Sequence, residues 1–385
     1  MELQVVGGGL AGLVAAVTAA EAGASVRLLE AHHELGGRAR TTPTPYAANE
    51  GPHVVYRDGP LWGWLRARDL LPAWCAVPPS AMTRFYFRRS GRRVRNPGTG
   101  LLRVALHRGR APVEDAFGTW AAATFGEGAA REAAAASAVA TYHHDAGALS
   151  ARFVHDRLRR AFAPASKATY VLGGWGRLVD TLAGAARERG VTIETDARVT
   201  TLPSGGPVVV ATSLAAARAL LGDDTLRTES GSTALVDVAV TARRGDAFIL
   251  SDLDAGGWLE RYTAADRSLA PAGESLLQVQ VPVAPGSPSG EGTARAEALL
   301  DLGVPGWRER TTWRRDAVAR GRTGAVDLPG STWRDRPAVS RGDGVFLAGD
   351  QVAAPGLLSE VSFTSAVEAA TLALEAAGLR PAAAH

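Results

Sequence analysis

Several residues near the N-terminus have the types and the spacing to bind a dinucleotide. Residues 7–12 have the pattern Gly-x-Gly-x-x-Gly, and the acidic residue Glu30 follows. Gly7 permits a tight turn, Gly9 lets a pyrophosphate approach the backbone, and Gly12 lets a helix pack closely against a strand. The Glu30 carboxylate can bind both hydroxyls of an adenosine ribose, and its charge repels a 2′-phosphate. The pattern therefore predicts a site for NAD or FAD and disfavours NADP.

These residues need a strand, a helix and a second strand to position them. The sequence has an apolar run at 3–6, an Ala-rich helical stretch at 13–22 and a second apolar run at 25–29 that Glu30 closes. Leu10 and Ala11 lie between the glycines and belong to the predicted phosphate-binding turn. The N-terminus of the helix would face the phosphates with free N–H groups and a partial positive charge. The alternative is a Gly-rich turn in another kind of α/β protein.

The composition excludes several classes of protein. The chain has 385 residues, 46% of them hydrophobic, so we expect a globular protein of two or more domains. The formal net charge of +3 argues against a polycationic nucleic-acid binder. Cys75 is the only cysteine, which excludes a disulfide framework and a multi-cysteine metal site. The sequence has no apolar run long enough to cross a membrane, and we expect a cytoplasmic protein.

The residues after Glu30 resemble a motif of known flavoproteins. The stretch 34–40, Glu-Leu-Gly-Gly-Arg-Ala-Arg, is similar to the second motif of the FAD-dependent amine oxidase, protoporphyrinogen oxidase and phytoene desaturase superfamily. The resemblance implies that the dinucleotide is FAD, that Gly37 approaches it and that Arg38 meets its pyrophosphate. A guanidinium group suits this role because its geometry matches a phosphate and it stays charged.

The resemblance continues near the C-terminus. Residues 344–350 form an apolar run that ends in Gly349 and Asp350. In the superfamily this strand brings an acid to the ribityl chain and flavin phosphate. The stretch 355–360 leads into a predicted helix at 361–377, whose N-terminus would face the flavin pyrimidine ring. A partial positive charge there stabilises anionic reduced flavin, and the backbone N–H groups near Leu358 and Ser359 are the candidates for this contact.

The middle of the chain also fits the superfamily. A Gly-Gly-Trp-Gly block at 173–176 precedes a predicted helix at 178–189. We predict strands at 191–194, 197–200 and 207–212. The resemblance implies that the backbone of Val199 contacts the adenine and that Ala211 ends a strand near the cofactor. The match is typical of a flavoprotein of this superfamily, but it does not specify a reaction.

Together these motifs predict an α/β fold with a discontinuous, Rossmann-type FAD-binding domain. The second domain would be an α+β substrate-binding domain, helical in its first part and with an antiparallel sheet in its second, where strands are predicted at 233–240 and 274–281 and a helix at 292–303. The FAD-binding domain would comprise residues 1–58, 166–230 and 338–385. The substrate-binding domain would comprise residues 59–165 and 231–337.

His53 is the best candidate for a catalytic side chain. The flavin carries the chemistry in such proteins, and the protein positions and tunes it. In the superfamily the stretch that contains Gly51, Pro52 and His53 crosses the flavin plane, and its Gly-Pro-His-x-x-Tyr form resembles bacterial members described as phytoene-dehydrogenase-like. His53 could act as an acid or base near neutral pH. The alternative is a histidine that only hydrogen-bonds the flavin edge or a neighbouring loop.

The other polar clusters are weaker candidates. His143, His144 and Asp145 have no evident third ligand, so we predict a helix end or loop rather than a metal site. We place His155 on the surface of a helix. The arginines between 84 and 110, around a predicted hairpin turn at Ser90, are interpreted as a solvated basic face, with peripheral contact to a membrane or an anionic substrate as the alternative.

The leading functional hypothesis is an FAD-dependent oxidoreductase. It would remove hydride from a small or lipophilic organic metabolite, by desaturation or dehydrogenation at flavin N5. Lys167, the only lysine, does not match the lysine that many amine oxidases hold near the flavin, so a flavin amine oxidase producing hydrogen peroxide is the alternative. An FAD-binding protein without redox turnover is the alternative of another class. No cysteine lies near the C-terminal helix, and we expect non-covalent FAD.

Overall fold

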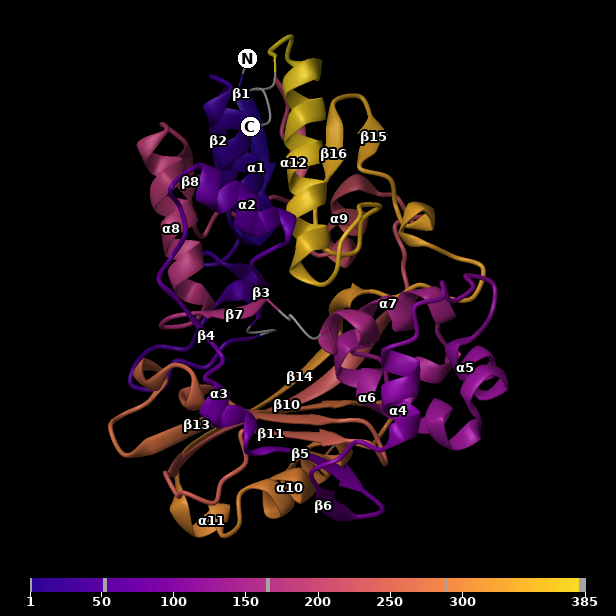
Figure 1. Cartoon of the computed structure of the whole chain (residues 1–385). Coiled ribbons are helices and arrows are strands. Elements are labelled where there is room, and N and C mark those ends of the chain that lie inside the picture. Colours follow the sequence, from indigo (N-terminus) through magenta and orange to yellow (C-terminus); the bar gives the residue numbers. More distant parts are fainter. Residues whose placement is uncertain (1, 51–53, 164–166, 289, 381–385) are drawn as a thin grey trace.

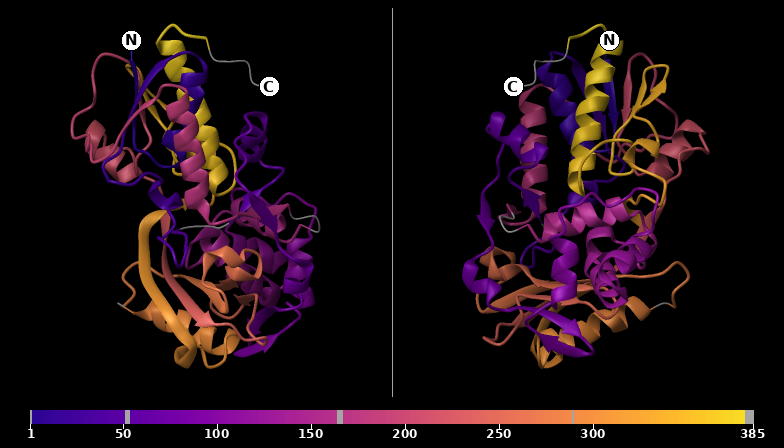
Figure 2. Two further views of the ribbon diagram at one scale, coloured as in Figure 1. Left: turned by 90° about the vertical axis from the view of Figure 1, so that its left-hand side faces the viewer. Right: turned by 45° about the vertical axis from the view of Figure 1, so that its right-hand side comes forward.

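The computed structural model describes residues 2–50, 54–163, 167–288 and 290–380, and it has two parts (Figure 1). A parallel sheet with its helices forms the upper part of the view, and a larger sheet with a group of helices forms the lower part. Figure 2 shows the same two parts from other sides, with α12 (yellow) along the upper part. None of the described helices is both long and apolar enough to span a lipid bilayer.

The upper sheet is built from three regions that lie far apart in the sequence. Its described strands run in the order β15-β16-β9-β1-β2-β8, and all pairs are parallel except β15 with β16. Apolar residues bury both faces, as expected for a parallel sheet between helices. The strands are β1 (Glu2–Val6), β2 (Ser25–Leu29), β8 (Thr192–Glu194), β9 (Val208–Val210), β15 (Ser340–Gly342) and β16 (Val345–Leu347).

Three long helices pack on this sheet and on one another. Each begins two or three residues earlier than the sequence pattern indicates, because each continues directly from a turn rather than from its first apolar repeat. Small alanine side chains let α1 pack closely against both α8 and α12. The helices are α1 (Leu10–Glu21), α8 (Trp175–Glu188) and α12 (Ser359–Ala376), with the shorter α9 (Leu214–Leu221) after β9.

The strand predicted at 197–200 is wrong. No strand is present there, because Asp196, with a left-handed φ of 55°, turns the chain at the end of β8. The Ala197 N–H instead donates to the Glu30 carbonyl at 2.8 Å. The segment therefore follows the end of β2 as a loop.

The larger sheet lies in the lower part, and α10 covers one of its faces. Its described strands run in the order β14-β10-β13-β12-β11-β5-β6, all antiparallel except β5 with β11. Val236, Val238 and Val279 pack under α10, so the alternate residues of these strands face the other way. The elements are β5 (Phe85–Arg89), β6 (Arg92–Val94), β10 (Ser230–Thr241), β11 (Ile249–Asp252), β12 (Trp258–Arg261), β13 (Glu274–Pro282), α10 (Glu291–Gly303), α11 (Trp307–Arg310) and β14 (Thr311–Ala325).

The remaining elements form a helical group and a small connecting sheet. The helical group has its own core, which includes Phe117 and Leu158. The small sheet has the order β3-β7-β4. The elements are β3 (Val55–Tyr56), α2 (Pro60–Ala67), β4 (Trp74–Ala76), α3 (Pro79–Met82), α4 (Thr99–Ala105), α5 (Phe117–Phe125), α6 (Glu127–Thr141), α7 (Ala151–Ala161) and β7 (Ala168–Val171).

Two expectations for this region have opposite outcomes. The hairpin turn at Ser90 is confirmed, and the Asp254 carboxylate accepts the Ser90 N–H at 2.7 Å. His155, expected on a helix surface, is fully buried in α7, where its Nε2 lies 3.1 Å from the Val104 carbonyl. Burial lowers the pKa of His155. The sequence pattern failed there because the helical group packs on the face of α7 that carries this polar residue.

The glycine of α1 gives a stability prediction. A Cβ at Gly12 would overlap the carbonyl oxygen of Gly7, whereas a Cβ at Gly184 in α8 would meet open space. We expect Gly12→Ala to destabilise the fold by about 3 kcal/mol, because backbone must move. Gly184→Ala should stabilise it by about 0.5–1 kcal/mol. Urea unfolding of both variants measures the difference, and equal stabilities would contradict the close packing.

Candidate dinucleotide-binding site

The turn after β1 holds three backbone segments against each other. Gly7 has a φ of 107°, and a Cβ there would lie 2.6 Å from the Ala211 carbonyl oxygen. The Ala211 N–H in turn donates to the Val6 carbonyl at 2.8 Å. Gly12 approaches Gly7 from the first turn of α1. The structure therefore brings Gly7, Gly12 and Ala211 to the same end of the parallel sheet.

Gly9 and Gly37 leave open space beside their Cα atoms, because neither has a side chain. The atom nearest to a Cβ placed on Gly9 would be the Gly36 carbonyl oxygen, at 3.8 Å. A Cβ on Gly37 would lie 3.5 Å from the Gly9 Cα, so two residues without side chains face each other. Leu10 and Ala11 begin α1, and the N–H groups of a first helical turn have no partner within the helix. This cradle suits a phosphate group.

Arg38 and Asp350 join the two ends of the sequence at this cradle. The Arg38 Nη2 lies 2.6 Å from the Asp350 Oδ1. Burial lowers the pKa of the Arg38 guanidinium, but the Asp350 carboxylate more than offsets this, so the pKa is raised and the charge is kept. Before Asp350, the Gly349 N–H donates to the Ser365 Oγ of α12 at 2.9 Å. The turn after β16 is thereby fixed to α12.

Glu30 is buried and ionised at the end of β2. Its Oε2 accepts the Gly8 N–H at 2.7 Å, and its Oε1 lies 2.9 Å from the His32 amide nitrogen and 2.7 Å from the His32 Nδ1. Burial raises the pKa of Glu30, but these hydrogen bonds outweigh it and the pKa is lowered. His32 was not among the predicted residues, although its place two residues after Glu30 could have indicated it. Val199 is half-buried against the core of the parallel sheet.

The start of α12 is strained. Leu358 has φ 55° and ψ −123°, a conformation that a residue with a side chain rarely adopts. The Leu357 N–H donates to the Glu360 carboxylate at 3.0 Å, and Ser359 is the first residue of the helix. The structure therefore places Leu358 and Ser359 at the helix N-terminus, as the sequence predicts. Backbone strain of this kind gathers at ligand sites.

Asn49 connects the parallel sheet's helices to the larger sheet. Its Oδ1 accepts the Trp175 N–H at the start of α8 at 2.9 Å and the Thr41 hydroxyl at 2.7 Å. Its main-chain carbonyl accepts from the Gln278 Nε2 at 3.1 Å and from the Arg315 Nη2 at 2.9 Å. Asn49 is 3% exposed. Asn49 is therefore held from both sides, by the start of α8 and by the larger sheet.

A buried ion pair lies next to the main-chain carbonyl of Asn49. Asp237 on β10 stands opposite both Gln278 on β13 and Arg315 on β14. Arg315 donates to one Asp237 oxygen at 2.6 and 2.9 Å, and Gln278 donates to the other at 2.7 Å. Burial raises the pKa of Asp237, although Arg315 and Gln278 act to lower it. These side chains occupy the face of the sheet that α10 leaves uncovered.

Glu260 continues this row of polar side chains on β12, opposite Gln278. It accepts hydrogen bonds from the Tyr170 hydroxyl and, at 2.8 Å, from the Trp258 Nε1. Burial raises the pKa of Glu260 despite these donors. Sequence reasoning missed the row, because polar residues that alternate with Val and Leu usually mark a solvated face. Its signal in the sequence was that Asp237 alternates with valines in one predicted strand and that Gln278 and Gln280 alternate with Leu and Val in another.

Three of the predicted cofactor residues, Gly51, Pro52 and His53, lie outside the described residues. His53 is also the predicted catalytic residue, so the geometry of that prediction stays open. Within residues 2–50, 54–163, 167–288 and 290–380, no group of three or more His, Cys, Asp or Glu side chains is arranged to hold a metal ion.

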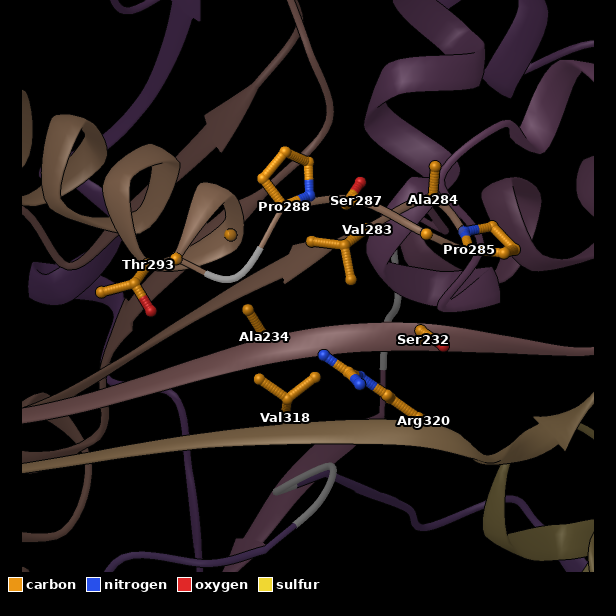
Figure 3. Close-up of a pocket in the computed structure, with 13 residues that line it drawn as sticks. Ser232, Ala234, Val283, Ala284, Pro285, Ser287, Pro288, Thr293, Val318 and Arg320 are labelled. Atoms are coloured by element: carbon orange, nitrogen blue, oxygen red, sulfur yellow. The ribbon is translucent and has the colours of Figure 1, made fainter.

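A surface pocket of about 160 Å³ lies elsewhere (Figure 3). It is lined by Ala234, Ser232 and Arg320 from two strands and by Thr293 at the start of α10. Ala234 packs with the α10 side of the sheet. The pocket is therefore on the opposite face from Asp237 and is separate from the dinucleotide cradle.

Comparison with protein families and curated sequences gives one match. Residues 5–68 match the family of NAD(P)-binding Rossmann-like domains. This range contains the glycine turn, Glu30 and Arg38. The sequence has no significant match among curated proteins.

Solved structures share the fold over almost the whole chain. An oxidoreductase from Methanosarcina mazei matches with a TM-score of 0.74 at 16% identity, over 96% of this chain and 99% of that one. Cyclohexylamine oxidase from Brevibacterium oxydans matches with a TM-score of 0.71 at 16% identity, over 97% of this chain and 98% of that one. Reduced UDP-galactopyranose mutase matches with a TM-score of 0.71 at 14% identity, over 97% of this chain and 95% of that one. The predicted resemblance and fold class are confirmed: the chain has the α/β fold of the flavin amine oxidases, in which a Rossmann-like parallel sheet accompanies a separate, mostly antiparallel sheet.

Proposed function

We propose that the protein is an FAD-dependent oxidoreductase that removes hydride from an organic metabolite. The contact between Arg38 and Asp350 carries this proposal, because it joins the motif after β2 to the motif after β16 beside the glycine turn. A nicotinamide site needs only the first of these motifs. The solved structures with this fold that are amine oxidases or other oxidoreductases support the same conclusion.

The residues present fit FAD as a non-covalent ligand. The open space at Gly9 and Gly37 admits a pyrophosphate, and Arg38 supplies a charged donor. The ionised Glu30 would take the adenosine ribose in exchange for its contact with His32. The remaining proposed contacts follow the cradle from the adenine to the flavin. They are Gly7, Leu10, Ala11, Gly12, Val199 and Ala211, then Gly51, Pro52 and His53, and finally Gly349, Asp350, Leu358 and Ser359.

Bound flavin supplies a two-electron acceptor at its N5 atom. The substrate would lose a hydride from carbon and a proton from a neighbouring atom, which balances its two-electron oxidation. His53 is the proposed acid or base for that proton. Desaturation or dehydrogenation is the leading reaction. Amine oxidation is the second candidate, since cyclohexylamine oxidase and putrescine oxidase share the fold at 16% and 14% identity.

The ribose contact gives the first test. Purified protein incubated with FAD should bind it and become yellow. Glu30→Gln should weaken FAD binding by about 10- to 100-fold, because it removes charge-assisted hydrogen bonds. Glu34→Gln is the matched control, since its exposed carboxylate lies in the next loop. Equilibrium dialysis measures both affinities. Equal affinity in the Glu30 variant would refute the assigned contact, and a protein that takes up no FAD would refute the function.

Anaerobic flavin reduction tests turnover and the role of His53. His53→Ala should slow reduction by about 10²–10⁴-fold, as expected on loss of a general acid or base, and this loss should be well beyond any loss of FAD affinity. His33→Ala is the control, because His33 is exposed beside Glu34. Stopped-flow absorbance gives the rates, and hydrogen peroxide formed in air separates an oxidase from a desaturase. If both variants are reduced at the wild-type rate, His53 has no catalytic role.

Removing the Arg315 guanidinium tests whether the buried ion pair supports Asn49. Arg315→Met leaves Asp237 buried without its partner and should destabilise the fold by about 3–5 kcal/mol. Arg314→Met is the control, since Arg314 makes partly exposed ion pairs with Asp316 and Glu297 and should cost less than about 1 kcal/mol. Denaturant unfolding at neutral pH measures both. Similar losses in the two variants would show that the buried pair does not hold this region.

A further inference from the structure

A buried arginine without an acidic partner lies on α7. Arg157 is 9% exposed, and its Nη1 donates to the Phe153 carbonyl one turn earlier at 3.1 Å. The Phe153 ring covers one face of the guanidinium group, whose Cζ lies 3.4 Å from the ring centroid. A guanidinium group has five N–H donors, and the other four have no acceptor among the described residues. The rest of the chain, outside the described ranges, contains no Asp or Glu.

The buried charges around Arg157 do not balance. At the start of α7, the Ser150 N–H donates to the Asp327 carbonyl at 2.9 Å. The Asp327 carboxylate is taken by Arg336, whose Nε and Nη2 donate to its Oδ1 at 3.0 and 2.7 Å. Arg336 is 9% exposed and Asp327 is 8% exposed. In this cluster of Arg157, Arg336 and Asp327, two buried guanidinium groups share one carboxylate, which leaves one positive charge without a partner.

An unbalanced buried cation opposes folding, because desolvation penalises it and no anion offsets the penalty. Burial lowers the pKa of Arg157 to about 9, while Asp327 acts to raise it and Arg336 to lower it. The guanidinium group is therefore cationic at neutral pH. A methionine would fill a similar volume in α7 without this cost. The missing negative charge is expected to come from a ligand, since the chain does not supply it.

Arg157 lies between two segments that carry proposed flavin contacts. Arg160 is three residues further along the same face of α7, and its Cζ lies 4.1 Å from the ring centroid of Tyr56, which follows the stretch 51–53. On the other side of the cluster, the Ala325 N–H donates to the Asp350 carbonyl at 3.2 Å. Figure 1 shows α7 on the side of the helical group that lies toward the parallel sheet. A ligand held by Arg157 would therefore extend toward the flavin end of the cradle.

We propose that Arg157 binds a carboxylate group of the substrate and so determines specificity for carboxylic acids. The inference rests on the proposed function and names its substrate class. A carboxylate supplies the single negative charge that the cluster lacks, and its two oxygens match two N–H groups of a guanidinium group. A phosphate dianion would instead leave an excess negative charge beside Asp327. Holding the substrate at its carboxylate would orient its oxidised carbon toward the cradle.

Two pairs of probes that differ in charge test the contact. Benzoate with benzamide, and acetate with acetamide, are titrated at pH 7 into the apoprotein by calorimetry and into FAD-loaded protein by the visible flavin spectrum. Wild type should bind a carboxylate about 10- to 100-fold more tightly than its amide, the value of hydrogen bonds to a charged group. Arg157→Met should abolish this preference, and Arg157→Lys should keep part of it. Arg159→Met, which changes an exposed arginine of the same helix, is the control and should bind as wild type does.

Melting temperatures of the apoprotein separate a ligand contact from a packing role. Arg157→Met removes an unbalanced charge, so the melting temperature should stay the same or rise by about 1–3 °C. Arg336→Met leaves Asp327 buried without its partner and should lower the melting temperature by about 5–10 °C. If Arg157→Met lowers it as much as Arg336→Met does, Arg157 is a structural residue and the inference is overturned.

The binding experiment can also overturn the inference. It fails if wild type binds carboxylate and amide equally, or if the preference survives in Arg157→Met. Arg157-dependent binding that leaves the flavin spectrum unchanged would place the carboxylate away from the flavin and overturn its assignment to the substrate. Failure of wild type to take up FAD counts against the proposed function instead, because calorimetry on the apoprotein measures the carboxylate contact without FAD.

Discussion

The two oxygens of Asn49 form a point at which the two sheets are tied together. The side-chain oxygen caps α8, which packs on the parallel sheet, and the carbonyl oxygen is held by Gln278 and Arg315 of the larger sheet. A residue that is 3% exposed leaves these acceptors no alternative bond to water. Any shift between the sheets must break at least one of these bonds, so the cradle and the polar row keep a fixed relation.

The same region shows why buried charge is used here for position rather than for stability. An ion pair such as Asp237 with Arg315 gains little net free energy, because desolvation offsets its attraction. It nevertheless orients a donor at the Asn49 carbonyl, which an apolar pair of equal volume could not do. Glu260 differs, since the described donors Tyr170 and Trp258 are uncharged. Its raised pKa is the consequence of burial without a cation.

The sequence allowed the cradle to be predicted because its constraints are local. Spacing between glycines fixes a turn, and the elements on either side of Gly7 and Glu30 are short and strongly patterned. The polar row could not be predicted, because Asp237 and Arg315 meet only through strand register. The predictions of a strand at 197–200 and of an exposed His155 failed for a related reason. A turn at Asp196 and the packing of the helical group overrode the local sequence pattern.

The difference between the cradle and the polar row also explains how one fold persists at low sequence identity. The cradle needs a few residues that lack side chains, and almost any apolar core can support them, so structures 14–16% identical can share the fold. The face of the larger sheet has no such requirement. Its side chains only have to satisfy one another and whatever lies against them, which leaves them free to change. The chemistry particular to this chain is therefore expected in Asp237, Gln278 and Glu260, rather than in the glycines by which the fold is recognised.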